Sequence, residues 1–293
     1  MHNKNERSLH HLEKIVAGLA LAAVLALSIG FAHGGEPAKK ADKVFLRSAV
    51  ALVQDAASGE TLIAKNQEAI LPIASITKLM TAIVLLDARL DLGQRVAISD
   101  EDYDHLKRTR SRLRAGTVLT RDDLLLLALM SSENRAAAAL GRTYPGGTEA
   151  FVAAMNAKGR ALGMADTRFV DATGLSSGNV SSAQDLARLV AAAHQFPLIG
   201  QYSTRESAMV QVFGRSQGFR NTNRLVRNSQ WDIGLSKTGY INEAGRCLVM
   251  RVRMASREVI VVLLDSWGKL SRVGDANRIR KWLESNAAAR PRG

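Results

Sequence analysis

The order of its apolar patterns limits the folds open to this chain more than any other feature. Residues 48–53 and 61–64 carry short apolar runs on either side of a glycine-containing turn, which predicts a β-hairpin. Helical periodicity then dominates until strand patterns return at residues 209–213, 246–254 and 258–264. This order predicts an α+β fold: an αβα sandwich whose antiparallel sheet is built from both chain ends and flanked by helices.

Residues 90–205 are predicted to form an all-helical lobe beside that sheet. A helix that begins at Ser75 is apolar on most of its faces, so we expect it to be buried. Further helices are expected at residues 124–130, 134–142, 148–162, 182–194 and 271–285. Pro197 should end the helix at 182–194. A cleft between the lobe and the sheet is the expected place for a functional site.

Residues 1–34 have the character of a signal peptide. A polar, basic start precedes an apolar run from Ile15 to Phe31, and small residues follow it. A helix of that run reaches about 25 Å, which is short of the roughly 30 Å of a bilayer core. We therefore expect export to the periplasm, with an uncleaved N-terminal anchor as the alternative. The expected parts that follow are a linker at 35–44, one domain at 45–286 and a frayed tail at 287–293.

The chain is strongly basic, because 40 Lys and Arg against 27 Asp and Glu give a formal net charge of +13. Such an excess favours an anionic partner. Nucleic acid is not expected, since only 5% of residues are aromatic and the basic run at 108–114 has none to stack on bases. For an exported protein the remaining polyanions are envelope polymers and lipid head groups.

The sequence argues against metal and thiol chemistry. A single cysteine, Cys247, leaves no internal disulfide and no thiolate-built zinc site. Past the leader only His105 and His194 remain, far apart and without metal-ligand spacing. A Ser-His-Asp triad would depend on the same two histidines. We therefore expect neither a metal nor a cofactor.

Three short motifs offer a different chemistry. Ser75 and Lys78 lie one helical turn apart on one face, so the amine can take the proton of the hydroxyl. Ser132 and Asn134 present a hydroxyl and an amide from a predicted turn. The tripeptide Lys237-Thr238-Gly239 offers a cation, a hydroxyl and a residue without Cβ, beside which a substrate backbone can lie.

Each motif alone has an ordinary structural explanation, such as a helix cap at Ser75 or a connecting turn at Ser132. Ser-x-x-Lys also recurs at residues 266–269, and Ser-x-Asn recurs at residues 177–179. All three motifs in this order are far more specific. They form the set that serine β-lactamases and penicillin-binding proteins share.

Across residues 45–285 the sequence resembles the low-molecular-mass penicillin-binding proteins, which are D-alanyl-D-alanine peptidases. Residues 72–82 look like their nucleophile segment. Residues 169–175 are similar to their Phe-x-x-x-x-Gly-Leu segment, which β-lactamases generally lack. Residues 129–137 and 237–250 resemble the endopeptidase branch of the family.

Two departures from related proteins bear on this resemblance. Glu133 stands in the second motif where β-lactamases usually have Asp, which weakens that alternative. Carboxypeptidases of the family usually carry a further C-terminal β-domain and an amphipathic anchor, for which little chain follows residue 285. We therefore expect an endopeptidase.

The resemblance implies a β-lactamase/DD-peptidase-like fold and a role for each catalytic residue. Ser75 would be the nucleophile, and Lys78 would be its general base. At pH 7 an ordinary lysine is almost wholly protonated, so burial and a second cation at Lys237 have to lower its pKa to about 7. Ser132 would relay a proton to the leaving amine.

The resemblance also implies a substrate-binding set. Asn134 would hold the substrate amide, while Lys237 and Thr238 would bind the carboxylate side of the substrate beside Gly239. The backbone N–H groups of Tyr240 and of the nucleophile would form the oxyanion hole.

The function so implied is that of an exported serine DD-peptidase that hydrolyses D-alanyl-diaminopimelate cross-bridges in peptidoglycan through a Ser75 acyl-enzyme. Its partners would be peptidoglycan peptide stems, with β-lactams as covalent inhibitors and murein or membrane contacted by the basic surface. Two alternatives stay open: a carboxypeptidase that acts on pentapeptide, and a non-catalytic penicillin-binding sensor.

Overall fold

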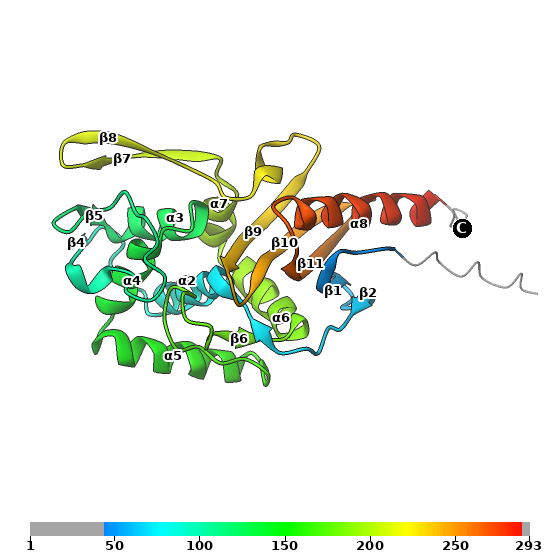
Figure 1. Cartoon of the computed structure of the whole chain (residues 1–293), viewed down its shortest axis with the longest axis horizontal. Helices are drawn as coiled ribbons and strands as arrows, with labels where there is room; N and C mark the ends of the chain where they lie inside the picture. Colours follow the sequence, from blue (N-terminus) through cyan, green and yellow to red (C-terminus); the bar gives the residue numbers. More distant parts are fainter. Residues whose placement is uncertain (1–43, 289–293) are drawn as a thin grey trace, which may run out of the picture. The chain divides into compact units, whose positions relative to one another are not determined.

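The predicted hairpin near the start of the chain forms strands β1 (Ser48–Asp55) and β2 (Thr61–Lys65). The computed structural model describes residues 44–288 (Figure 1). The predicted signal peptide, the linker up to residue 43 and the tail from residue 289 lie outside the described residues. In the part that is described, no helix combines the length and the apolar character that crossing a bilayer requires.

Both ends of the chain contribute to one five-stranded antiparallel sheet, in the order β2-β1-β11-β10-β9 (Figure 1). Its late strands are β9 (Asp232–Ile241), β10 (Gly245–Met254) and β11 (Arg257–Ser266). β11 pairs with β1 on one side, where Val261 lies opposite Val53, and with β10 on the other. The predicted α+β fold with a sheet from both chain ends is therefore confirmed.

Helices and short strand pairs make up most of the remainder. The α-helices are α2 (Lys78–Asp87), α3 (Arg121–Met130), α4 (Asn134–Arg142), α5 (Gly147–Ala161), α6 (Ala183–His194), α7 (Pro197–Thr204) and α8 (Ser271–Ala288). The 3₁₀ helices are η1 (Ala74–Thr77), η2 (Asp100–Asp102) and η3 (Arg224–Arg227). The strand pairs are β3 (Leu71–Pro72) with β6 (Val180–Ser181), β4 (Arg95–Ala97) with β5 (Val118–Thr120), and β7 (Ser207–Val212) with β8 (Arg215–Arg220).

Helices cover both faces of the sheet. Alternate residues of a strand point to opposite sides, so each strand contributes to both of the layers between sheet and helices. Ala51 and Val53 of β1 pack in the layer that holds α8. Val50 and Leu52 belong to the larger core on the other face. There α6 packs against β1, β10 and β11, and α2 packs against α6 and against helices of the lobe. The sheet is thus the middle layer of the predicted sandwich (Figure 1).

Local signals set most helix ends. The hydroxyl of Thr120 accepts a hydrogen bond from the Asp123 N–H at 3.0 Å and so caps α3. Pro197, predicted only to stop a helix, also begins α7, where its missing N–H would have had no partner. The predicted lobe is not helical throughout, since it holds the β4–β5 pair. Those strands have three residues each, too few for a periodic pattern.

The β7–β8 hairpin follows α7 and extends beside the lobe, where β7 approaches β5 (Figure 1). The strand expected at residues 209–213 is β7, whereas β8 was not predicted. Phe219 is the one buried residue of β8, so its sequence has little apolar alternation to detect.

A buried carboxylate fastens the start of the sheet to the last helix. Asp275 of α8 is fully buried and accepts hydrogen bonds from the N–H of Arg47 at 2.9 Å and of Ser48 at 2.7 Å. It also pairs with Arg278. Burial alone would raise the pKa of Asp275, but its hydrogen bonds from Ser48, Arg47 and Arg278 outweigh burial and hold the pKa below 3.8.

We expect Asp275→Asn to lower the free energy of unfolding by about 2 kcal/mol, because buried donors lose a charged acceptor. The stabilisation should be present above the ordinary pKa of 3.8 and be lost as the pH falls through the lower folded value. Urea unfolding at pH 7 measures the difference. Asp232→Asn is the control, since its ion pair with Arg253 is exposed and weak; equal losses in both variants would contradict the prediction.

Candidate active site

The predicted nucleophile lies in a tight turn at the start of the buried helix. Ser75 is in η1, and Lys78 is the first residue of α2. Side chains three residues apart are eclipsed in a 3₁₀ helix. The Lys78 Nζ accordingly lies 2.9 Å from the Ser75 Oγ and donates a hydrogen bond to it.

Lys78 is fully buried, and its amine makes two more hydrogen bonds. Nζ donates to the Asn134 Oδ1 at 2.8 Å and to the carbonyl of Thr173 at 2.6 Å. With the Ser75 hydroxyl these acceptors account for all three N–H donors of an ammonium group. A neutral amine in the same place would turn one lone pair toward a neighbour, and the Ser75 hydroxyl is the neighbour with a proton to give.

Burial lowers the pKa of Lys78 to about 7, although the carboxylates of Asp171 and Glu133 partly oppose the shift. Burial also places the pKa of Lys237 well below its ordinary value, and the positive charge of Lys78 lowers it further. Two buried ammonium groups close together repel each other. The state in which only one of these two lysines is protonated is therefore favoured over the state in which both are.

The second motif lies at the end of α3 and the start of α4. Ser132 has a φ of 59°, a left-handed conformation that is strained for a residue with a side chain. The Lys237 Nζ donates to its Oγ at 2.9 Å. Asn134 begins α4, and its Nδ2 donates to the Thr109 Oγ1 at 3.0 Å. Each of the two motif lysines thus donates a hydrogen bond to one of the two motif serines.

The third motif lies within β9. β9 is at one edge of the five-stranded sheet and passes directly beside η1. A Cβ on Gly239 would lie 2.9 Å from the carbonyl oxygen of Ile73 and 3.1 Å from the nitrogen of Ser75. Only glycine allows this approach. The predicted space beside Gly239 is therefore filled first by the protein's own backbone.

A pocket of about 220 Å³ gathers these residues between the lobe and the sheet. It is lined by Ser75, Ser132, Asn134, Thr222, Thr238, Gly239, Tyr240 and Arg272. The buried amines of Lys78 and Lys237 reach its two serines. All eight site residues predicted from the sequence are therefore brought together.

Two pocket residues were not predicted. Arg272 of α8 donates to the carbonyls of Gly239 at 3.2 Å and Cys247 at 3.0 Å, and its half-buried guanidinium adds a positive charge to the pocket. Thr222 shares a hydrogen bond of 2.6 Å with Thr238. Neither belongs to a motif with a fixed spacing, so no sequence signal marks them.

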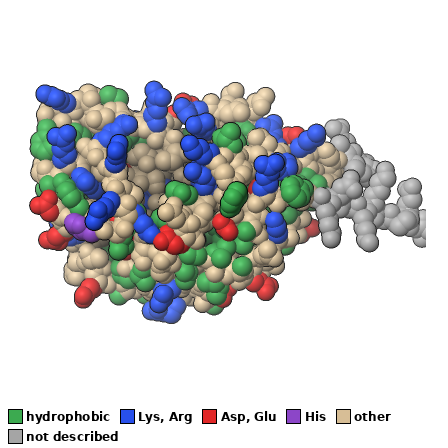
Figure 2. Space-filling view, in the orientation of Figure 1, with side chains coloured by type: hydrophobic (Ala, Val, Ile, Leu, Met, Phe, Trp, Pro, Cys, Tyr) green, Lys and Arg blue, Asp and Glu red, His purple; other side chains and the backbone are tan. Residues whose placement is uncertain are grey.

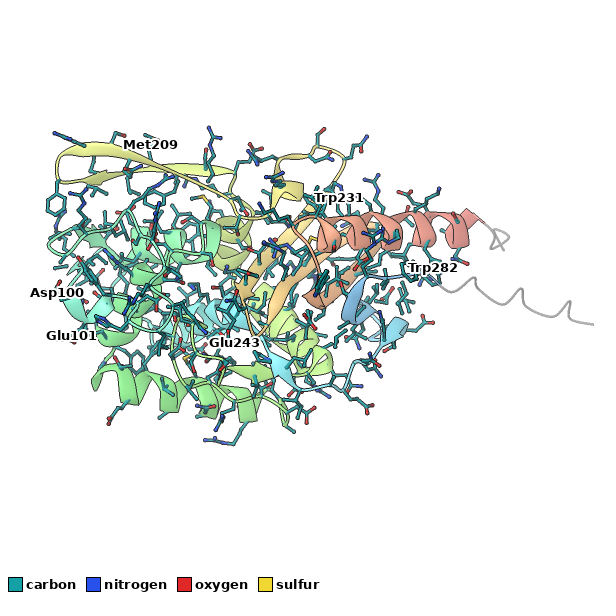
Figure 3. The ribbon with its side chains drawn as sticks, viewed as in Figure 1. Asp100, Glu101, Met209, Trp231, Glu243 and Trp282 are labelled. Atoms are coloured by element: carbon teal, nitrogen blue, oxygen red, sulfur yellow. The ribbon has the colours of Figure 1, made fainter. Side chains whose placement is uncertain are left out.

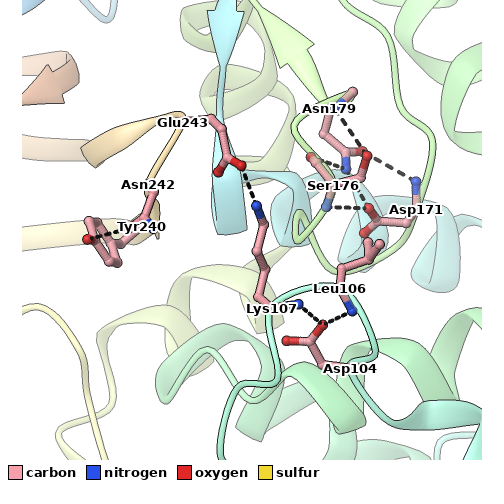
Figure 4. Close-up of polar contacts among 10 residues, drawn as sticks. Asp104, Leu106, Lys107, Asp171, Ser176, Asn179, Tyr240, Asn242 and Glu243 are labelled. Atoms are coloured by element: carbon pink, nitrogen blue, oxygen red, sulfur yellow. Dashed lines mark hydrogen bonds and ion pairs between the residues drawn. The ribbon is translucent and has the colours of Figure 1, made fainter.

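The segment at residues 169–175 packs against the turn that carries Ser75. Asp171 accepts hydrogen bonds from the N–H of Ser176 at 3.0 Å and from the side chain of Asn179 at 2.7 Å (Figure 4). It also accepts one from the N–H of Gly174 at 2.7 Å. Gly174 has a φ of 79°, and a Cβ there would lie 2.0 Å from the carbonyl oxygen of Ala74. Asn179, in the second Ser-x-Asn match, is thus structural.

A loop of the lobe is tied to the turn between β9 and β10. Asp104 accepts hydrogen bonds from the N–H groups of Leu106 at 3.0 Å and Lys107 at 2.8 Å, and the Lys107 side chain forms an ion pair with Glu243 beyond β9 (Figure 4).

Across residues 44–288 no three His, Cys, Asp or Glu side chains are grouped as metal ligands.

Comparisons with known proteins agree with this geometry. The model of the family described as Peptidase_S11, D-alanyl-D-alanine carboxypeptidase, matches residues 37–268. A D-alanyl-D-alanine endopeptidase of Pseudomonas aeruginosa is 48% identical over 89% of this chain and 86% of its own. One of Escherichia coli is 46% identical over 82% of this chain and 78% of its own.

The crystal structure of the Streptomyces K15 DD-transpeptidase superposes with a TM-score of 0.76, at 24% identity, over 83% of this chain and 99% of that one. That likeness confirms the predicted DD-peptidase-like fold. The resemblance to the endopeptidase branch, the penicillin-binding protein 7 type, is confirmed by the two relatives. The chain therefore belongs to the Peptidase_S11 family of D-alanyl-D-alanine peptidases, the low-molecular-mass penicillin-binding proteins.

Proposed function

We propose that this protein is an exported serine endopeptidase that hydrolyses D-alanyl-diaminopimelate cross-bridges in peptidoglycan through an acyl-enzyme on Ser75. The observation that carries the proposal is the pair of 2.9 Å hydrogen bonds, Lys78 to Ser75 and Lys237 to Ser132, on one pocket beside an edge strand. The names of the two bacterial relatives support the endopeptidase over the carboxypeptidase.

Acylation begins with a proton transfer. Neutral Lys78 takes the proton of the Ser75 hydroxyl, and the Oγ attacks the D-alanyl carbonyl carbon. The carbonyl oxygen becomes an oxyanion, which the N–H groups of Ser75 and Tyr240 stabilise. A pKa of about 7 leaves a large share of Lys78 neutral at physiological pH, as a general base requires.

Collapse of the tetrahedral intermediate breaks the C–N bond. The leaving amine takes a proton from the Ser132 hydroxyl, which regains one from the Lys237 ammonium bonded to it. Water then attacks the ester of the acyl-enzyme and releases Ser75. The lysines return to their starting protonation states by exchange with solvent through the open pocket.

Substrate binding uses the polar rim of the pocket. Asn134 keeps one N–H free after bonding Thr109, and this N–H holds the substrate amide. Thr238 and Lys237 take the carboxylate next to the leaving amine, and Arg272 adds a guanidinium on the same side. A β-lactam presents a similar carboxylate and amide, so it acylates Ser75.

The proposed location is the periplasm, reached through the signal peptide at residues 1–34. There the basic surface would contact murein or the membrane. A carboxypeptidase and a non-catalytic sensor remain the two alternatives, since both would keep the same nucleophile.

A paired digestion tests the proposal. The purified protein is given a cross-linked dimer muropeptide and a monomeric pentapeptide, and products are separated by chromatography. We expect conversion of dimer to monomer, with little free D-alanine from the pentapeptide. Ser75→Ala should lose at least about 10⁴-fold of this activity, because nothing else supplies the nucleophile.

Other outcomes separate the alternatives. Release of D-alanine without cleavage of the dimer would favour a carboxypeptidase. Acylation by benzylpenicillin with no Ser75-dependent turnover of either substrate would favour the sensor.

The pKa of Lys78 predicts a pH dependence. The rate constant for acylation by benzylpenicillin should rise about tenfold between pH 6 and pH 8 and then level off, because the neutral amine is the active form. Stopped-flow measurements give the profile, and circular dichroism shows that the fold is unchanged over this range. A flat or falling profile would rule out Lys78 as the base.

A further inference from the structure

A larger groove adjoins the catalytic pocket on the side of the β7–β8 hairpin. Its volume is about 1100 Å³, and it is lined by the loop at residues 110–112, by Ser131 and Glu133, and by strands β7 and β8. On the face drawn in Figure 2, Lys and Arg side chains surround a hollowed area of the surface below that hairpin. The mechanism proposed above does not use this groove.

Arginines dominate the charge of the groove. Arg110, Arg112 and Arg220 line it, and Glu133 is the one carboxylate among its lining residues, which leaves a net charge of +2. Within residues 44–288 neither Arg110 nor Arg220 makes a side-chain hydrogen bond or an ion pair, and both are exposed. Their guanidinium groups are therefore available to an anionic ligand.

Arg112 has a different role, because it joins the two walls. Its guanidinium donates to the carbonyl of Gly218 and lies 5.6 Å from the centre of the Phe219 ring. Met209 on β7 adds an exposed apolar side chain to the wall (Figure 3). Within the described residues the groove thus combines a contact between its walls, two arginines without a side-chain partner and some apolar surface.

The groove shares its rim with the catalytic pocket. Ser131 and Glu133 line the groove, while Ser132 between them lines the pocket. Arg110 follows Thr109, which bonds Asn134 of the pocket. On the other wall, Arg220 in the groove is two residues before Thr222 in the pocket.

The position of the groove relative to Ser132 decides which part of a substrate can enter the groove. Under the proposed function, Ser132 protonates the leaving amine, so the groove begins where the leaving group departs. In a cross-bridge that leaving group is a whole peptide stem, whose chain carries free carboxylates. Free D-alanine, the leaving group of a carboxypeptidase, is too small to reach along a groove of this size.

We propose that this groove binds the second peptide stem of the cross-link, with Arg110 and Arg220 pairing with its carboxylates. The inference rests on the proposed function and adds to it a subsite that favours cross-linked over monomeric substrate. Arg112 is not assigned to the stem, because its guanidinium already bonds Gly218.

The test compares Arg110→Gln/Arg220→Gln with the wild-type protein. Two constants are measured on each sample: kcat/KM for the cross-linked dimer, and the second-order rate constant for acylation by benzylpenicillin, which has no second stem. We expect the ratio of the first to the second to fall about tenfold or more, equivalent to about 1.4 kcal/mol.

The control is Arg95→Gln/Arg227→Gln, which removes two exposed arginines outside the groove and changes the net charge equally. It should keep the wild-type ratio. A second probe is a dimer whose leaving stem keeps the carboxylate next to the leaving amine, which Thr238 and Lys237 bind, but carries carboxamides in place of its other carboxylates. The wild-type ratio should fall on this probe, and the groove variant should lose nothing further.

Three results would overturn the groove proposal: an unchanged ratio, a parallel fall of both constants, or an equal loss in the control variant. Failure of the wild-type protein to cleave the dimer at all would overturn the proposed function and the groove proposal together. Turnover of the dimer with an unchanged ratio would overturn the groove proposal alone.

Discussion

Two lysine side chains buried side by side are the constraint on which the rest of the site depends. Lys78 is 0% exposed and Lys237 is 1% exposed. A buried amine is stable only where acceptors surround it, and here they come from η1, α4, the segment at 169–175 and β9. Lobe and sheet therefore have to meet before either amine is satisfied. The same burial lowers both pKa values, so the packing that forms the cleft also produces the base.

The sequence predicts the reacting groups better than the groups that hold them. Proton transfer between Ser75 and Lys78 requires that they lie one helical turn apart. This requirement fixes their spacing in the sequence, where it can be recognised. Arg272 and Thr222 reach the pocket only through packing of α8 and of the segment after β8, and no spacing announces such a contact. Of the fold, the sheet from both chain ends was predictable from pattern order, whereas β8 was not, because its polar residues face solvent on a hairpin.

Two glycines show where chemical and packing explanations of a motif differ. From the sequence, Gly239 was expected to make room for substrate; in the structure its missing Cβ first lets β9 lie against the backbone of Ile73 and Ser75. Gly174 does the same beneath Ala74. Ala74 itself has a φ of 47°, so the turn that carries the nucleophile is strained and is held between two close backbone contacts. The backbone that carries Ser75 is thus enclosed by β9 on one side and by the segment at 169–175 on the other.

The pairing of β1 with β11 has a consequence for how the protein comes into being. β1 pairs at once with β2, but its neighbour on the other side is β11, the last strand of the domain, so the sheet is complete only when β11 is present. Contacts this distant in sequence form slowly. A chain that is still being made therefore has Ser75 before it has β9 and Lys237. The catalytic pocket therefore cannot assemble until synthesis has passed β9, which is late in the domain.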